Sequence, residues 1–220
     1  MPASRRTPHR ATTTALLIAA AGIAHAGRPL TVDDAGTNAK GEGHVELWGS
    51  RADGATTWNV SPAYALTEGL ELAALASRDA THRITGTALQ VKWLATPSRE
   101  SGCNAGLAGG GSRSSDGGGG INAAFVNGIV SCNGTLLGAV HLNLGAERTS
   151  GASSTGTWGI ALEREVGRVT PHVEWFGAEG SKPALQFGLR GDVAQNLQLD
   201  GTFGRRDGSS LYSVGIKLRF

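Results

Sequence analysis

The 220-residue sequence contains no apolar run long enough to form a transmembrane helix. The apolar stretch Ala15–Ala24 is far shorter than the roughly 20 residues that such a helix needs. Clusters of lysine and arginine are also missing after residue 26, which excludes the basic patch of a nucleic-acid-binding protein. A chain without a spanning helix can still cross a membrane as a closed β-barrel, because a barrel pairs its backbone groups internally.

Motifs for catalysis and cofactor binding are absent as well. The glycine runs Gly109–Gly111 and Gly117–Gly120 are not followed by Gly-Lys-Ser/Thr, so they do not indicate a phosphate-binding loop. The six histidines include no pair with zinc-ligand spacing, and no G-x-S-x-G motif accompanies the many serines. We therefore predict no enzyme activity, no cofactor and no metal site.

The first 26 residues have the layout of a cleavable secretory signal peptide. Three arginines precede the apolar stretch Ala15–Ala24, and Ala24-His25-Ala26 provides a cleavage site of the A-x-A type. The formal net charge of +2 includes these three arginines, so the chain from Gly27 onwards has 17 basic and 18 acidic residues. The basic character therefore belongs largely to the segment that is removed on export.

Glycine content and residue alternation together predict β-strands. The 34 glycines are about twice the usual share of roughly 7%. They are spread through segments in which apolar and polar residues alternate, as they do in strands with two different faces. Alternation is clearest in the last strand, which ends on an aromatic residue. Its apolar face consists of Tyr212, Val214, Ile216, Leu218 and Phe220. This ending resembles the C-terminal strand that the barrel-assembly machinery of the outer membrane reads.

Counting such segments predicts a transmembrane antiparallel up-and-down barrel of about twelve strands, an even number as in bacterial barrels. If the weakest segment, 103–112, is a loop, the alternative is ten strands. The predicted strands are 44–51, 56–64, 70–78, 83–95, 103–112, 120–132, 135–147, 155–164, 169–177, 183–191, 196–205 and 210–220.

The connections between these segments alternate in character. Short turns, among them Asn133-Gly134, are expected on the periplasmic side, and Gly/Ser-rich loops on the outside. Only the connection 96–102 breaks this rule, because it is long on the short-turn side. With this topology, most aromatic residues fall into two belts near the strand ends, as in the aromatic girdles of outer-membrane barrels. The outer belt contains Trp58, Trp158, Trp175, Phe203 and Tyr212, and the inner belt contains Tyr64, Trp93 and Phe220.

The polar faces of these strands predict a lumen of mixed charge. Such a lumen fits either a hydrated pore or a salt-bridged plug, because a dry unpaired charge is very costly. Small inward residues, such as Gly159, Ala161 and Gly188, favour a narrow wet passage. The predicted lumen-lining residues are Glu46, Asn59, Glu71, Lys92, His141, Asn143, Glu163, His172, Glu174, Arg190, Asp200, Lys217 and Arg219.

Cys103 and Cys132 are predicted to form a disulfide, because exported proteins fold in an oxidising compartment. The midpoint between them falls near position 117.5, inside the glycine-rich loop expected between their two strands. Antiparallel partners at such positions have Cβ atoms about 4.5–5.5 Å apart, which is close enough for a disulfide after small adjustment.

The sequence after the signal peptide resembles a known group of outer-membrane barrels. Residues 28–37, Arg-Pro-Leu-Thr-Val-Asp-Asp-Ala-Gly-Thr, followed by Lys40-Gly41 and Glu46-Leu47, are similar to the start of the MetA-pathway phenol-degradation ("transporter") family. Residues 61–72 resemble the Y-G-L-T-x-x-L-E-L turn of that family, with Ala65 in place of glycine. The resemblance covers residues 28–72 and the terminal strand. It implies a barrel and suggests transport of small molecules, aromatic ones included, and it carries over no binding residues.

These observations divide the chain into a signal peptide (1–26), a periplasmic or lumenal lead-in (27–42) and a barrel (43–220). In the lead-in, Asp33 and Asp34 could contact a cation or an arginine, or the segment could be a flexible leader.

We expect a passive or weakly selective channel for small molecules in the outer membrane of a Gram-negative bacterium. Its expected partners are membrane lipid, the assembly machinery and a small-molecule substrate, with no nucleic acid. The alternatives are a non-conducting structural barrel that presents loops to partners and an outer-membrane lipid-modifying enzyme.

Overall fold

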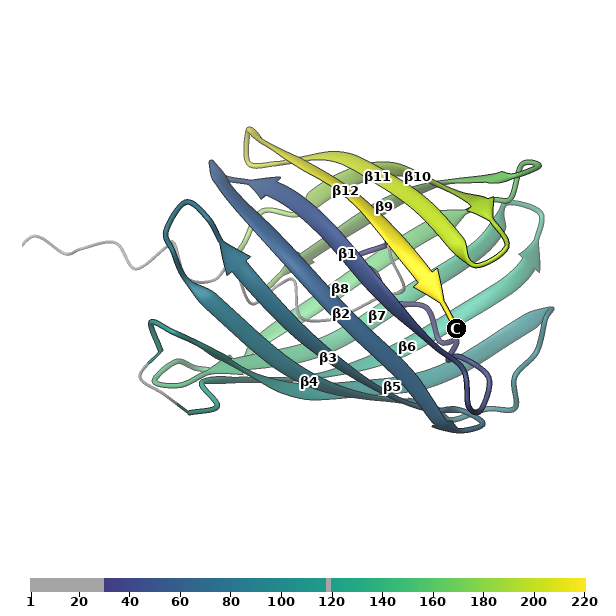
Figure 1. Ribbon diagram of the computed structural model, residues 1–220, viewed down its shortest axis with the longest axis horizontal. Coiled ribbons are helices and arrows are strands. Elements are labelled where there is room, and N and C mark those ends of the chain that lie inside the picture. Colours follow the sequence, from purple (N-terminus) through teal and green to yellow (C-terminus); the bar gives the residue numbers. More distant parts are fainter. Residues whose placement is uncertain (1–29, 118–119) are drawn as a thin grey trace, which may run out of the picture.

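A computed structural model describes residues 30–117 and 120–220 and shows one closed antiparallel barrel of twelve strands (Figure 1). Each strand pairs with its neighbours in sequence, and the first strand pairs with the last to close the barrel. The predicted signal peptide lies outside the described residues. The strands are β1 (Gly43–Ala52), β2 (Ala55–Thr67), β3 (Leu70–Asp79), β4 (Thr85–Leu94), β5 (Gly102–Ser114), β6 (Ala123–Thr135), β7 (Gly138–Thr149), β8 (Thr155–Glu163), β9 (Val169–Ala178), β10 (Ala184–Ala194), β11 (Leu197–Arg206) and β12 (Ser209–Arg219).

The strand count confirms twelve rather than ten. Segment 103–112, which is weakest in the sequence, belongs to the 13-residue strand β5; it pairs with β6 along its length and with β4 from Gly106 onwards. All twelve strands have 9 to 13 residues, which suits tilted strands that cross a bilayer. Among the residues that the structure describes, no helix is long and apolar enough to cross a membrane.

Buried and exposed side chains are distributed in the opposite way from a water-soluble protein. The inner face buries charged residues such as Glu174, which is 0% exposed, and Lys92, which is 4% exposed. At alternate positions the outer face exposes large apolar residues, including Leu89 at 70% and Val214 at 68%. A continuous exposed apolar wall is stable against lipid rather than water, so the barrel is a transmembrane one.

The turn between β6 and β7 lies further along the chain than the sequence predicts. Asn133-Gly134 is not the turn, because β6 continues to Thr135 and the chain reverses at Leu136-Leu137. Gly134 has a φ of 72° and lies where the β6–β7 register shifts, so its left-handed conformation belongs to a bulge. Leu136, predicted as a strand residue, is instead a turn residue with 97% of its surface exposed.

The aromatic residues of both predicted belts lie on or near the outward face of the barrel. Trp58, Phe203 and Tyr212 are near the loop ends of their strands, and Tyr64 and Trp93 are near the short-turn ends. Some of these rings contact each other across neighbouring strands. The ring centroids of Trp158 and Trp175 are 4.8 Å apart, and those of Phe203 and Tyr212 are 5.4 Å apart. This arrangement fits rings at the boundaries of a lipid bilayer.

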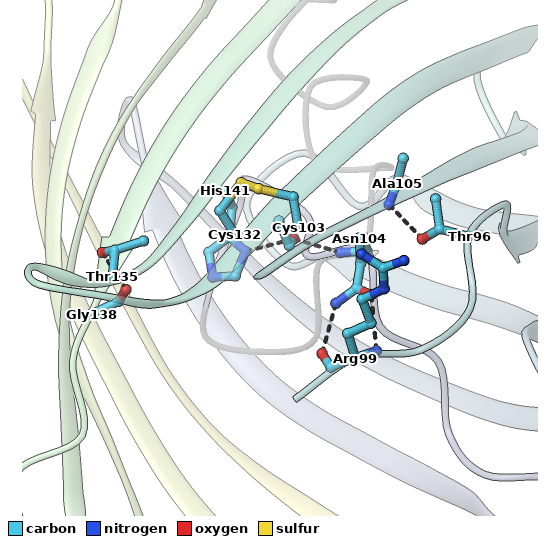
Figure 2. Close-up of a disulfide and its surroundings, with 11 residues drawn as sticks. Thr96, Arg99, Cys103, Asn104, Ala105, Cys132, Thr135, Gly138 and His141 are labelled. Carbon is cyan, nitrogen blue, oxygen red and sulfur yellow. Dashed lines mark hydrogen bonds between the residues drawn. A yellow bond between two sulfur atoms is a disulfide. The ribbon is translucent and has the colours of Figure 1, made fainter. Parts of the chain in front are cut away.

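The structure joins Cys103 and Cys132 by a disulfide between β5 and β6 (Figure 2). The two cysteines are direct partners in the register of the two strands, and their Cα atoms are 4.0 Å apart. The other pairs of this hairpin, from Gly102↔Asn133 to Ser112↔Ala123, share the same midpoint. The position of the cysteines therefore predicts the register of the whole hairpin.

We expect the double substitution Cys103→Ser and Cys132→Ser to lower the free energy of unfolding by about 2–4 kcal/mol, because the disulfide restricts the unfolded chain. The barrel should still form, since the β5–β6 backbone pairing does not need the bond. Denaturant titration in detergent measures the loss. Mass spectrometry of non-reduced peptides is the direct check, and two cysteines that are both free to react with an alkylating agent would contradict the disulfide.

Candidate functional site

The lumen is the candidate functional site, and the structure places every predicted lumen-lining residue at an inward position. Eight of the thirteen are buried and the other five are partly buried. The buried residues are Glu46, Glu71, Lys92, His141, Asn143, His172, Glu174 and Asp200, and the partly buried residues are Asn59, Glu163, Arg190, Lys217 and Arg219.

Part of the lumen charge is neutralised by ion pairs within the wall. Lys217 on β12 lies 2.8 Å from Glu46, its register partner on β1. Arg190 on β10 lies 2.9 Å from Glu163 on β8. These pairs join different strands and involve no residue outside the sheet. The wall therefore holds a mixture of both signs in which positive and negative groups lie close together.

A segment that precedes β1 lies inside the lumen; we call residues 30–38 the lumenal segment. Figure 1 draws it in purple within the barrel, leading to the start of β1. Leu30, Val32, Asp33 and Ala35 are all buried, and Asp33 is 0% exposed. These residues of the segment are therefore enclosed by the barrel wall.

The backbone of the lumenal segment is held by side chains of the wall. The amides of Thr31 and Val32 both donate hydrogen bonds to the Glu174 carboxylate, at 2.5 and 2.7 Å. The Asn143 side chain binds both backbone groups of Asp33, accepting from its amide at 2.7 Å and donating to its carbonyl at 2.8 Å. The amide of Ala35 donates to the Ser131 hydroxyl oxygen at 2.8 Å. Since buried backbone groups need partners, these contacts allow an irregular segment to lie inside the barrel.

Side chains of the lumenal segment add a second set of contacts. The Asp33 carboxylate accepts a hydrogen bond from the Lys92 ammonium at 2.7 Å, and both groups are buried. Burial raises the pKa of the Asp33 carboxyl to about 7, and the attraction of Lys92 opposes that rise. At the other end, Asn38 donates to the Glu71 carboxylate from its backbone amide at 2.9 Å and its side chain at 2.7 Å.

Small residues of the wall make room for the lumenal segment. Leu30 and Val32 pack against Ala161 and Phe176, and a Cβ atom at Gly159 would lie only 2.7 Å from Val32 Cγ2. Gly159 and Ala161 are two of the small residues that predict free volume in the lumen, but here that volume is occupied. The space at Gly188 is also occupied, here by a wall side chain, because a Cβ atom at Gly188 would lie 2.3 Å from the His172 ring.

A second apolar cluster lies further along the lumenal segment. Ala35 packs with Ala108 and Ile129, and Leu94 and Phe125 border the cluster. Both clusters join the segment to the wall, so each of these buried apolar clusters of the described residues contains part of the segment.

Two cavities flank the lumenal segment, and they share no lining residue. The outer cavity, of about 490 Å³, lies at the loop end and is lined by Thr31, Val32 and Phe125 among others. The inner cavity, of about 200 Å³, is lined by Asp34, Asn38 and wall residues such as Lys217. The segment therefore separates the space near the outside from the space near the short-turn end.

Ser131, His141 and Glu163 form a line on three adjacent strands that resembles a hydrolase triad in composition. The Ser131 hydroxyl lies 2.8 Å from His141 Nδ1, and His141 Nε2 lies 3.5 Å from the Glu163 carboxylate. However, the Ser131 oxygen is already bonded to the Ala35 amide, and all three residues face the lumen rather than the lipid. The arrangement supports the lumenal segment, since Ser131 is one of its anchors.

Several residues of the lumen wall are missing from the sequence-based set. Gln90, Asn127, Ser131, Gln186 and Gln198 are all buried and polar on the inner face. The signal for them is the same alternation that identifies the charged residues: Gln90 is two positions from Lys92, and Gln198 is two positions from Asp200. Uncharged polar residues give this signal more weakly than charges do.

The exceptional connection 95–101 folds back onto the lumen wall. Asn104, a buried residue of β5, exchanges two hydrogen bonds with the backbone of Arg99, at 3.0 and 2.9 Å (Figure 2). Thr96 accepts a hydrogen bond from the Ala105 amide at 3.0 Å. These contacts anchor the one long connection at the end of the barrel where the other described connections are short. It packs against the inner face of β5.

Comparison with known proteins places the chain in a family without an assigned function. The family described as "Uncharacterised conserved protein UCP029691" matches residues 14–220. Among curated proteins there is no match. The MetA-pathway family that the sequence resembles is therefore not the family that the match identifies.

Solved structures share the fold at low sequence identity. The KdgM porin aligns with 13% identity and a TM-score of 0.67, covering 80% of this chain and 99% of the porin. A structure of that porin in complex with disordered oligogalacturonate aligns with 12% identity and a TM-score of 0.64, covering 80% and 99% of the two chains. The NanC porin aligns with 8% identity and a TM-score of 0.64, covering 79% of this chain and 98% of the porin. These likenesses show a porin-like barrel fold.

The substitution Lys92→Met should loosen the lumenal segment, because it leaves the Asp33 carboxylate buried without its cation. Breaking a buried ion pair costs roughly 3–5 kcal/mol. Hydrogen exchange of the Thr31, Val32, Asp33 and Ala35 amides, measured by NMR in detergent, should accelerate strongly. A suitable control is Lys182→Met, which removes an exposed pair with Asp207 and should cost less than about 1 kcal/mol. Equal protection of the four amides in both variants would contradict the anchoring role of Lys92.

Proposed function

This chain belongs to the family described as "Uncharacterised conserved protein UCP029691", and we propose that it forms an outer-membrane channel for small polar molecules. The observation that carries this proposal is the lumen. Its wall holds charges of both signs, and cavities of about 490 and 200 Å³ lie on the two sides of the lumenal segment. A purely structural barrel has no need for space on both sides of its interior.

The number of strands is consistent with this function. Barrels of about eight strands are filled by their own side chains, whereas barrels of 16–18 strands leave a wide aqueous channel. With twelve strands the inward residues decide, and much of this wall is lined by Gly, Ala, Ser and Asn. The porin-like fold supports the same proposal.

Outer-membrane localisation has three lines of support. The apolar outward face with aromatic residues near both ends matches a bilayer. The last strand exposes Tyr212, Val214, Ile216, Leu218 and Phe220 on that face, as a strand read by the barrel-assembly machinery would. The predicted signal peptide supplies the export step. We infer that membrane lipid and the assembly machinery are partners of this protein.

The lumen also argues against the alternative of a lipid-modifying enzyme. Such an enzyme needs a serine and a histidine that reach the lipid. The Ser131–His141 pair faces the interior, where Ala35 covers it. We therefore propose a passive channel without enzyme activity.

The cargo class follows from the outer cavity and from the resemblance to the MetA-pathway family. Small solutes that carry both polar groups and a ring suit this cavity, because Phe125 and Phe176 line it beside Asn127 and Asn143. The resemblance over residues 28–72 supports extending the proposal to small aromatic molecules.

Planar-bilayer recordings should show a small conductance with weak ion selectivity, because the charges of the wall nearly balance. The substitution Arg190→Gln removes a positive charge from the wall and should shift the reversal potential in a KCl gradient towards that of a cation-selective channel. Arg148→Gln is the control, because Arg148 is exposed at an outward position of β7 and its loss should leave selectivity unchanged.

The recordings need verified folded protein, which a change of gel mobility on boiling provides. If neither the full chain nor a chain lacking residues 30–37 conducts, the channel function is wrong and the structural barrel replaces it.

A further inference from the structure

We propose that the lumen wall carries a binding site for an extended acidic peptide and that the lumenal segment occupies this site as the channel's own blocker. The inference rests on the proposed channel function and adds both a ligand class and a means of control. Three observations carry it: the polar contacts, the fit of the wall to the segment, and the independence of the barrel from the segment.

The polar contacts of the wall are made to backbone groups of the segment, as expected for a site that binds a peptide rather than for side chains that only fill space. Glu174, Asn143 and Ser131 accept four backbone N–H donors of the segment, and Asn143 also donates to a backbone carbonyl. Backbone amides and carbonyls are present in any peptide, so these three residues recognise an extended chain as such. Lys92 adds selectivity, because its ammonium pairs with the carboxylate of Asp33.

The wall is also shaped for a chain at this place. Gly159 leaves room for Val32, Ala161 packs against Leu30 and Val32, and Ala108 packs against Ala35. A larger side chain at Gly159 would collide with the segment. The small residues therefore form a groove whose contour follows the segment.

The barrel itself does not depend on the segment. Strand pairing runs around the closed sheet without it, and the ion pairs Glu46–Lys217 and Glu163–Arg190 lie within the wall. The covalent link is the turn 39–42, in which Gly41 has a φ of 84° and Glu42 donates to the Ala39 carbonyl. With the predicted signal peptide removed, the segment is attached to the barrel only through this turn, so it can leave the groove while the sheet stays closed. Water would then hydrate Glu174 and Lys92.

A blocker of this kind makes the pore sensitive to competing ligands. A short peptide that combines free backbone amides with a carboxylate side chain would meet the same partners as Thr31–Ala35. We expect such a peptide to bind where the segment lies and to exclude it from the groove.

The first test compares the full chain with a variant that lacks residues 30–37, both recorded in planar bilayers after folding is verified. Removal of the blocker should raise the single-channel conductance or the open probability several-fold. Equal currents from the two proteins would overturn the blocker and leave the channel function standing. Absence of current from both would overturn the channel function as well.

The second test adds the blocker to the deletion variant as a separate peptide. A synthetic peptide of residues 30–38, Leu-Thr-Val-Asp-Asp-Ala-Gly-Thr-Asn, should block the current of the deletion variant in a concentration-dependent way. A peptide with alanine at the position of Asp33 should block about tenfold less well, because it loses a hydrogen bond between charged groups. Equal block by both peptides, or no block by either, would overturn the binding site.

The steric fit provides a matched pair of variants in the full chain. Gly159→Ala places a Cβ atom 2.7 Å from Val32, so it should displace the segment and increase the current. Gly156→Ala on the same strand meets its nearest neighbour at an ordinary 3.6 Å and should not change the current. Unchanged current in Gly159→Ala protein that shows normal heat-modifiable migration would count against the groove.

Discussion

A charge inside a membrane barrel must be paired or hydrated, and this requirement governs the interior of the protein. Alternate side chains of the closed sheet point to lipid and to the lumen, so polar groups are placed on the lumen face. Some charges of the wall find partners on other strands, as Glu163 does with Arg190. Glu174 and Lys92 instead use the lumenal segment, whose backbone amides and Asp33 carboxylate satisfy them. The position of the segment follows from the electrostatics of the wall.

Features that depend on a regular period are predictable from the sequence. Alternation identifies all twelve strands and the inward position of Lys92 and its counterparts, because a strand has a fixed two-residue repeat. The spacing of Cys103 and Cys132 predicts the register of one hairpin. The prediction is wrong at the β6–β7 turn, where a bulge at Gly134 moves the reversal to Leu136-Leu137. A glycine with positive φ serves a bulge as well as a turn, so composition alone does not separate the two.

The lumenal segment is harder to predict because it has no period. Asp33 meets Lys92, which is 59 positions away, and its backbone meets Asn143, which is 110 positions away. These contacts exist only after the barrel has closed. The same limit applies to the small inward residues: Gly159 and Ala161 indicate volume in the lumen, but the sequence does not state what fills it. In this barrel, a neighbouring part of the same chain does.

The position of the lumenal segment immediately before β1 has a consequence for the order of assembly. Its main anchors come from β3, β4, β6, β7 and β9, whereas the seam that closes the barrel lies between β1 and β12. An open, curved sheet already presents these anchors on its concave side. The segment can therefore settle on the unfinished sheet, and the joining of the first and last strands then encloses it. No end of the polypeptide has to be threaded through a finished ring.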